Sequence, residues 1–258
     1  MKLASKVKYK WSDTVVMSKR SLVHTSRNFD AFITTLVLPI IMMLLFVYVF
    51  GGAIDTGSVE YINYVVPGIT LLCIGYTAST TAVSVNNDMT KGIIDRFRSM
   101  PIAKSSVLTG HVFASVVRNV LTTTLVVLVA FLMGFQTNAT AVEWLLVVGI
   151  LLLYTLAMTW LSVVFGLLAN SAEGAGAFSF FVLFLPYLSS AFVPTETMPS
   201  VVRMFAENQP MTPINETIRA FLMDTPVGNN AVIAILWCVS IIFLSYLFAL
   251  FVYKRKAV

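Results

Sequence analysis

The stretch NNDMTKGIIDRFRSMPIAKSS, residues 86–106, decides how this chain is arranged. It is short and polar, and it lies between two long apolar runs. Apolar side chains recur within it at helical spacing: Met89, Ile93, Phe97 and Met100. Asn87 or Asp88 can cap the start of a helix here, and Pro101 can end it, because proline cannot continue the backbone hydrogen-bond ladder. The stretch therefore predicts an amphipathic helix of about three turns.

Charged side chains take many of the other positions in this stretch: Asp88, Lys91, Asp95, Arg96, Arg98 and Lys104. A helix that is apolar on one side and charged on the other is suited to rest against another protein or the membrane surface. The alternative is a loop whose charges only follow the topology rule for membrane proteins. Apolar residues at helical spacing are not expected in a solvated loop, so we favour the helix.

The composition places the chain in a membrane. Of its 258 residues, 58% are hydrophobic and 11% are charged, and the mean hydropathy is +0.86. A soluble domain has about a quarter charged residues, so the apolar runs leave no room for one. Cys73 and Cys238 both lie in apolar runs, which argues against a disulfide framework. The net charge of +5 reflects the placement of basic residues and does not indicate nucleic acid binding.

Six apolar runs predict an all-α polytopic protein with one transmembrane domain, residues 31–253. About 20 apolar residues cross the ~30 Å hydrocarbon core. The N-terminal residues lack the apolar core and cleavage site of a secretory signal, so we expect the first run to remain as a span. The predicted spans are residues 31–50, 61–85, 107–135, 144–169, 177–193 and 231–253.

The proline-rich residues 194–228, between the last two spans, predict two short helices at the outer interface. Apolar residues recur there at helical spacing: Val201, Val202 and Phe205, then Ile214, Ile218, Phe221 and Leu222.

Basic residues predict that both termini are cytoplasmic. Residues 1–30 hold seven Lys and Arg, the connector holds four and the basic tail, residues 254–258, holds three, out of 17 in the chain. This asymmetry is the positive-inside bias. Trp11, Val15, Ser18 and Leu22 share one helical face, so residues 1–30 predict an amphipathic helix on the inner leaflet. A solvated basic tail is the alternative.

Four polar residues inside predicted spans are candidates to line a transport pathway: Thr77, Thr81, Ser84 and Arg118. Hydroxyl groups in spans more often bond the carbonyl four residues back or a neighbouring helix, so we favour packing for the first three. Arg118 lies early in a run too long for one perpendicular crossing. We favour a side chain that extends to the interface, with a role in the substrate path as the alternative.

The sequence lacks the motifs of a hydrolase. It contains no Gly-Lys pair, so it has no phosphate-binding G-x-x-x-x-G-K-[ST] loop. His24 and His111 are its two histidines, too few for a usual zinc site, and no predicted span buries a carboxylate. We therefore expect no catalytic residue, metal site or cofactor on this chain. If transport is driven, the energy source lies on another chain.

The run KGIIDRFRSMPIAKSSVLTG, Lys91 to Gly110, resembles the cytoplasmic coupling segment of ATP-binding-cassette (ABC) type-2 exporter permeases. It is most similar to the daunorubicin-resistance branch of multidrug efflux permeases, which carries a related G-hydrophobic-hydrophobic-D-R-F-R-S-hydrophobic-P run. The resemblance extends to the order of the predicted elements along the whole chain. Residues 208–213, NQPMTP, resemble the family's N-P-hydrophobic-T-P element, from which Gln209 departs.

The resemblance implies a permease subunit, not itself an enzyme, in the cell membrane of a prokaryote. Such a subunit pairs with a second permease copy, identical or similar, and docks two separate ATPase subunits that bind ATP and Mg. It moves amphipathic drugs or lipids outward. The residues implied to form the ATPase-coupling helix are Met89, Lys91, Ile93, Asp95, Arg96, Phe97, Arg98, Met100 and Pro101.

Three other functions remain open at this point. An ABC exporter of polysaccharide or glycolipid is the nearest, although it would be expected to line its channel with aromatic residues. The four tryptophans lie mainly near predicted interfaces, which favours drug-like or lipid cargo. An ATP-independent channel, or a membrane scaffold or immunity protein that binds partners through the connector, belongs to a different class.

Overall fold

The computed structural model of the chain describes residues 29–54, 56, 59–91 and 104–255. The predicted interfacial helix, most of the predicted coupling helix and the end of the basic tail lie outside these residues. Within the described residues the regular elements are helices, as the sequence predicts. They are α2 (Phe29–Leu44), the π-helical η1 (Leu45–Phe50), α3 (Tyr61–Thr90), α5 (Lys104–Leu132), α6 (Ala141–Leu168), α7 (Ala172–Tyr187), the 3-10 turn η2 (Thr195–Thr197), α8 (Ser200–Asn208), α9 (Met211–Met223) and α10 (Asn230–Arg255).

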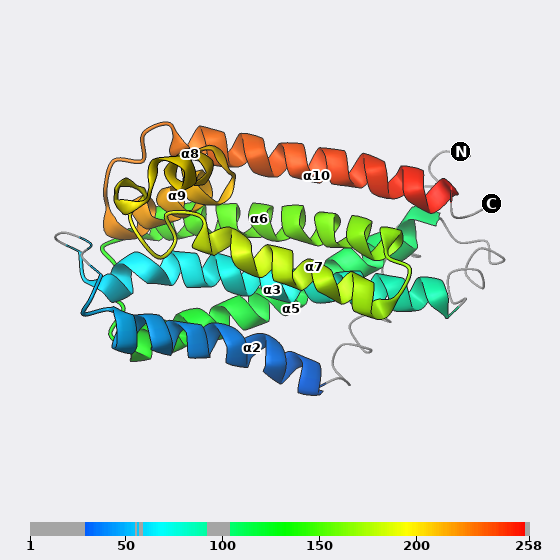
Figure 1. The fold of residues 1–258 in the computed structure, drawn as a ribbon, viewed down its shortest axis with the longest axis horizontal. Coiled ribbons are helices and arrows are strands. Elements are labelled where there is room, and N and C mark those ends of the chain that lie inside the picture. Colours follow the sequence, from blue (N-terminus) through cyan, green and yellow to red (C-terminus); the bar gives the residue numbers. More distant parts are fainter. Residues whose placement is uncertain (1–28, 55, 57–58, 92–103, 256–258) are drawn as a thin grey trace.

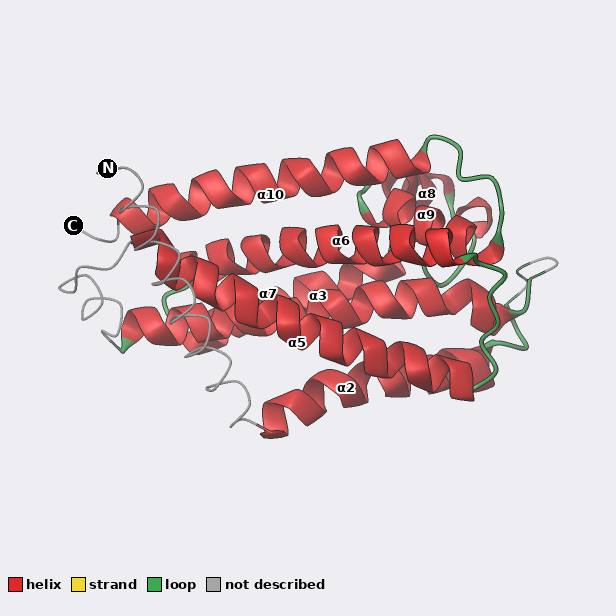
Figure 2. Cartoon of the chain, turned by 180° about the vertical axis from the view of Figure 1, so that it is seen from behind, coloured by secondary structure: helices red, strands yellow, loops and turns green. Residues whose placement is uncertain are grey.

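The long helices form an elongated bundle (Figure 1). The ends of α3 and α10 and the start of α5 lie at one end of it, which we call the connector end because residues 92–103 join α3 to α5 there. The short helices α8 and α9 lie at the opposite end. Figure 2 shows the same arrangement from behind. The bundle thus separates the end that carries the connector from the end that carries the short helices.

Five of the described helices are long and apolar enough to cross a membrane: Ile33–Phe50, Tyr61–Thr90, Val107–Leu132, Ala141–Leu168 and Asn230–Tyr253. The predicted fifth span, residues 177–193, overlaps α7, which has 16 residues and is about 24 Å long. After Tyr187 the chain turns instead of continuing as a helix. The count of six spans and the sidedness of the termini stay predictions.

Helix α3 forms the centre of the bundle. It packs against α5, α6 and α7, and most of its side chains are buried. Helices α2 and α10 lie at the periphery, with many apolar side chains exposed. Exposed apolar faces are expected on helices that contact lipid or another subunit.

Two glycines allow close contacts to the central helix. A Cβ atom built on Gly68 of α3 would lie 2.7 Å from the carbonyl oxygen of Ala191. A Cβ atom built on Gly166 of α6 would lie 2.4 Å from the carbonyl oxygen of Ala82. Small residues at such crossings let helix backbones approach closely.

The predicted start of the coupling helix is wrong. Asn87 and Asp88 lie inside α3, which continues to Thr90 instead of ending near Val85. No proline or glycine interrupts residues 85–90, and Asn86 is held by α6, its side-chain amide donating to the carbonyl oxygens of Gly166 (3.3 Å) and Ala169 (2.7 Å). Contacts with a neighbouring helix therefore extend α3 into the polar stretch. The gap between α6 and α7 is also shorter than predicted, because Ser171 caps α7.

Candidate functional site

The described part of the predicted coupling helix is small. Met89 lies in the last turn of α3, and Lys91, which is exposed, follows the end of that helix. The other predicted members lie outside the described residues: Ile93, Asp95, Arg96, Phe97, Arg98, Met100 and Pro101. What the structure does show is the base to which the connector attaches.

That base is a compact apolar cluster at the connector end, which we call the base cluster. Its buried side chains come from α3, α5, α6 and α10: Val85, Val107, Leu108, Val112, Trp160, Val163, Val164, Leu167, Ala249, Val252 and Tyr253. Met89 packs against it. Close-packed interiors transmit displacement because they have few voids. A force applied to the connector would therefore reach four helices through one cluster.

Three polar contacts join α3 to α5 in one antiparallel register, and we call them the polar ladder. Thr77 contacts Thr122 with 3.4 Å between their Oγ1 atoms. Four residues further along α3, the Oγ1 atom of Thr81 accepts from Nη2 of Arg118 at 3.3 Å, four residues earlier in α5. Asp88, seven residues after Thr81 in α3, contacts His111, which lies seven residues before Arg118 in α5. Equal steps in opposite directions show that the contacts follow one face of each helix.

The contact nearest the connector is the strongest candidate to hold the two helices together. The Nε2 atom of His111 lies 3.1 Å from Oδ2 of Asp88, and both side chains are about nine-tenths buried. Removing a hydrogen-bond partner from a buried carboxylate carries a desolvation penalty. The pair therefore fixes the end of α3 relative to the start of α5, on both sides of the connector.

A double-mutant cycle measures this coupling. We expect Asp88→Ala and His111→Ala each to lower the free energy of unfolding by about 1–3 kcal/mol, with a coupling energy of about 1 kcal/mol or more. The Thr77–Thr122 contact is the control, because it is long and uncharged, and we expect its coupling energy to be below about 0.5 kcal/mol. Denaturant titration in detergent gives both values. Equal coupling energies at the two pairs would contradict a special role for Asp88 and His111.

The predicted pathway residues are mostly buried against protein. Thr77 and Thr81 are 0% and 1% exposed, and their hydroxyl groups contact α5. Ser84 donates to the carbonyl oxygen of Thr80, four residues back. These contacts are the packing roles that we favoured for the three hydroxyl groups. A pathway role for them stays a prediction.

Arg118 differs from these residues. Helix α5 is continuous from Lys104 to Leu132, and Arg118 lies at its middle, level with Thr81. Its guanidinium group donates sideways to α3, and its Nε atom is buried without a hydrogen-bond partner. We expected this side chain to extend toward the membrane surface, but its contact with Thr81 shows that it points toward α3.

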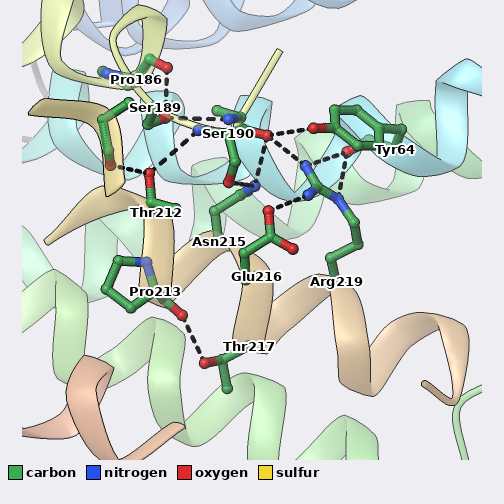
Figure 3. Close-up of polar contacts among 12 residues, drawn as sticks. Tyr64, Pro186, Ser189, Ser190, Thr212, Pro213, Asn215, Glu216, Thr217 and Arg219 are labelled. Carbon is green, nitrogen blue, oxygen red and sulfur yellow. Dashed lines mark hydrogen bonds and ion pairs between the residues drawn. The ribbon is translucent and has the colours of Figure 1, made fainter. Parts of the chain in front are cut away.

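A second polar cluster, around Arg219 of α9, was missed by the sequence reasoning, which gave this residue no role. Figure 3 shows that its guanidinium group reaches the backbone of two distant segments. Nη2 donates to the carbonyl oxygens of Ser190 (2.7 Å) and Tyr64 (3.1 Å), and Nε donates to the same Tyr64 oxygen at 3.2 Å. Nη1 pairs with Glu216 at 2.6 Å, and the guanidinium carbon lies 3.6 Å from the centre of the Tyr64 ring.

The Arg219 cluster provides hydrogen-bond donors for backbone that lies outside the helices. The carbonyl oxygen of Ser190, in the turn after α7, also accepts from the Tyr64 hydroxyl at 3.0 Å and from the Asn215 amide at 3.2 Å (Figure 3). Non-helical backbone inside a membrane protein is tolerated where other protein groups meet its polar atoms. The cluster therefore allows α7 to end early while α9 stays docked on α3. Glu216, one turn before Arg219, was the available sequence signal.

Comparison with known proteins identifies the family. Residues 12–223 match the family described as ABC-2 type transporter, and these residues make up most of the chain. The chain belongs to the ABC-2 type transporter family. A daunorubicin resistance ABC transporter permease protein from Streptomyces coeruleorubidus is 30% identical over 203 residues, which cover 74% of this chain and 71% of the relative. A probable doxorubicin resistance ABC transporter permease protein from Mycobacterium tuberculosis is 23% identical over 234 residues, covering 89% and 84%.

These relatives confirm the resemblance drawn from residues 91–110. This ABC-2 chain is an integral membrane protein of the permease type, like the relatives. The relatives are named as permease proteins of ABC transporters. The family match also extends beyond the connector, over the described helices from α2 to α9.

Proposed function

We propose that this chain is the membrane subunit of an ABC exporter that moves an amphipathic drug-like or lipid substrate outward. The observation that carries the proposal is the match of residues 12–223 to the ABC-2 family, together with relatives named for drug resistance. The energy source would be ATP hydrolysed on a separate ATPase subunit. The absence of a phosphate-binding loop from the sequence agrees with this division of roles.

The complete transporter would contain two permease chains and two ATPase subunits. The second permease would be a copy of this chain or a similar one, and ATP and Mg would be bound by the ATPase subunits alone. The exposed apolar faces of the peripheral helices are suited to contact lipids or a second permease. The predicted coupling helix would dock on the ATPase with Phe97 in its apolar stripe.

Coupling would pass from the connector into the bundle by two routes. Met89 and the base cluster link the end of α3 to α5, α6 and α10 through apolar contacts. The Asp88–His111 contact links α3 to α5 through a polar contact of 3.1 Å. Closure of the ATPase pair would therefore displace helices at the connector end as a group. The apolar base makes a rigid-body response more favourable than local bending.

The proposed topology has six spans with both termini cytoplasmic, and α7 would be the fifth. The helix alone is shorter than the ~30 Å core, so the buried turn after Tyr187 would complete the crossing. The Arg219 cluster supports this, because it supplies the hydrogen bonds that such a turn needs. The connector would then be cytosolic, with α8 and α9 on the outer side.

The test is co-expression of the tagged permease with a candidate ABC ATPase from the same organism, with wild-type Phe97 and with Phe97→Asp. We expect the ATPase to co-purify with the wild-type chain and hydrolyse ATP in nanodiscs. We expect Phe97→Asp to lower both by at least about tenfold, because a charge in the apolar stripe disfavours docking. Phe205→Asp is the matched control, because Phe205 is an exposed residue of α8 at the opposite end.

Normal ATPase binding and export by a correctly inserted Phe97→Asp variant would argue against the docking role. A folded wild-type chain that binds no ATPase would favour an ATP-independent channel or a scaffold. Export of a polysaccharide or glycolipid by an intact complex would retain the exporter and change the cargo.

A further inference from the structure

Arg118 carries a positive charge at the middle of α5. It lies 14 residues from each end of α5, about 21 Å from either. Among the described residues no acidic side chain forms an ion pair with it, and its one hydrogen bond goes to the neutral hydroxyl of Thr81. An arginine side chain has five N–H donors in a planar fork. Most of that capacity is therefore unused.

Arg219, which is buried, has a different set of contacts from Arg118. Every nitrogen of the Arg219 guanidinium group donates to a carbonyl or carboxylate oxygen. Nε of Arg118 is buried without a partner, and on the same helix Oδ1 of Asn119 and Oγ1 of Thr123 are also unpaired. Ionisable residues within membrane spans commonly mark substrate or ion pathways. Arg219 is satisfied by the fold, whereas Arg118 is left available.

Arg118 lies beside a strip of exposed apolar side chains on α5. Arg118 is partly exposed and lies at the border between the buried and exposed faces of α5. Leu121 and Leu125 follow it at helical spacing on the same side, and both are exposed large apolar residues. Leu128 and Leu132 continue this exposed strip toward the end of the helix. A polar head at Arg118 would place an apolar tail along the strip.

We propose that Arg118 binds the oxyanion of an amphiphile, a phosphate or carboxylate head group, whose apolar tail lies along Leu121 and Leu125. The planar guanidinium fork matches the geometry of both oxyanions. If the bound amphiphile is cargo, this part of the inference rests on the proposed exporter function. It then narrows the substrate class to amphiphiles that carry an acidic group and excludes cationic ones.

The experiment is equilibrium binding of fluorescent lipids to the purified full-length chain in neutral detergent at high ionic strength, which screens the surface charges. Three probes with identical acyl chains carry a phosphate, a trimethylammonium or an uncharged hydroxyl head. We expect the wild-type chain to bind the phosphate lipid at least tenfold more tightly than the other two. We expect Arg118→Gln to abolish this preference and Arg118→Lys to retain part of it.

Arg255→Gln is the matched control, because it removes the same guanidinium charge from an exposed position at the end of α10. We expect it to leave the preference unchanged. An equal loss in Arg255→Gln, or equal binding of the three probes by the wild-type chain, would overturn the proposal. The wild-type comparison does not require any variant to fold. Competition with inorganic phosphate distinguishes a lipid head group from a free anion. If inorganic phosphate displaces the phosphate lipid at equal concentration, the site binds a free oxyanion and the apolar tail does not contribute to binding.

The outcome is separable from that of the proposed function. A preference for the phosphate lipid in a chain that binds no ATPase would support the oxyanion site at Arg118 and contradict the proposed exporter function. An ATPase-coupled complex in which the wild-type chain shows no preference for the phosphate probe would keep the exporter and reject the site.

Discussion

Replacing Arg219 with Met is expected to lower the free energy of unfolding by about 3–5 kcal/mol, the range measured when one partner of a buried ionic network is removed. Methionine fills a similar volume but cannot donate to the carbonyl oxygens of Ser190 and Tyr64. The carbonyl oxygen of Ser190 in the turn after α7 then has one donor fewer, and α9 loses its main polar contact with α3. We expect Arg219→Lys to be intermediate, because it keeps the charge without the fork.

Arg203→Met is the matched control for this prediction. Arg203 also pairs with a glutamate one turn away, Glu207 at 2.7 Å, but on the exposed surface of α8. We expect little change from its loss, because exposed ion pairs contribute little. Denaturant titration in detergent and the amount of folded protein in the membrane measure both variants. Similar stabilities for Arg219→Met and Arg203→Met would show that the buried cluster is not needed for the fold.

Replacing Gly166 with Ala is expected to lower the free energy of unfolding by about 1–3 kcal/mol, the usual cost of overpacking. The added Cβ atom would meet the carbonyl oxygen of Ala82 at 2.4 Å and its Cα atom at 3.0 Å. Both are backbone atoms, so no side chain can rotate away, and α3 and α6 must separate. Separation also weakens the two hydrogen bonds from Asn86 to α6. Since Asn86 holds the end of α3, we expect ATPase coupling to fall with stability.

Gly149→Ala tests whether the effect comes from packing rather than from the substitution itself. Gly149 lies on the same helix, and a Cβ atom built there meets nothing within 4 Å. Alanine favours the helix over glycine by about 0.5–1 kcal/mol, so this variant should be neutral or slightly more stable. Equal losses at Gly149 and Gly166 would contradict a close crossing between α3 and α6.

The sequence was sufficient to predict a membrane protein, because a membrane-spanning segment needs a long run of apolar residues and such a run is a local feature. Most of the apolar runs are long enough to identify a span by themselves, and the placement of Lys and Arg predicts an orientation from short segments. The connector motif added a family, which the match over residues 12–223 confirms. The segment between the last two predicted spans also contains two short helices, α8 and α9, where apolar spacing indicated them.

The limits of the helices and the roles of the polar residues depended on contacts between distant segments. Asn86 is 80 residues from Gly166, and Arg219 is 155 residues from Tyr64, so neither contact is visible in a local pattern. The sequence alone determined that the chain is a membrane protein with a polar connector, because hydropathy and charge act locally, and the connector motif indicated the permease family. Tertiary structure decided that α3 runs on to Thr90, that Arg219 is satisfied and that Arg118 is not. The free energy of a buried polar group depends on which partners the fold brings to it.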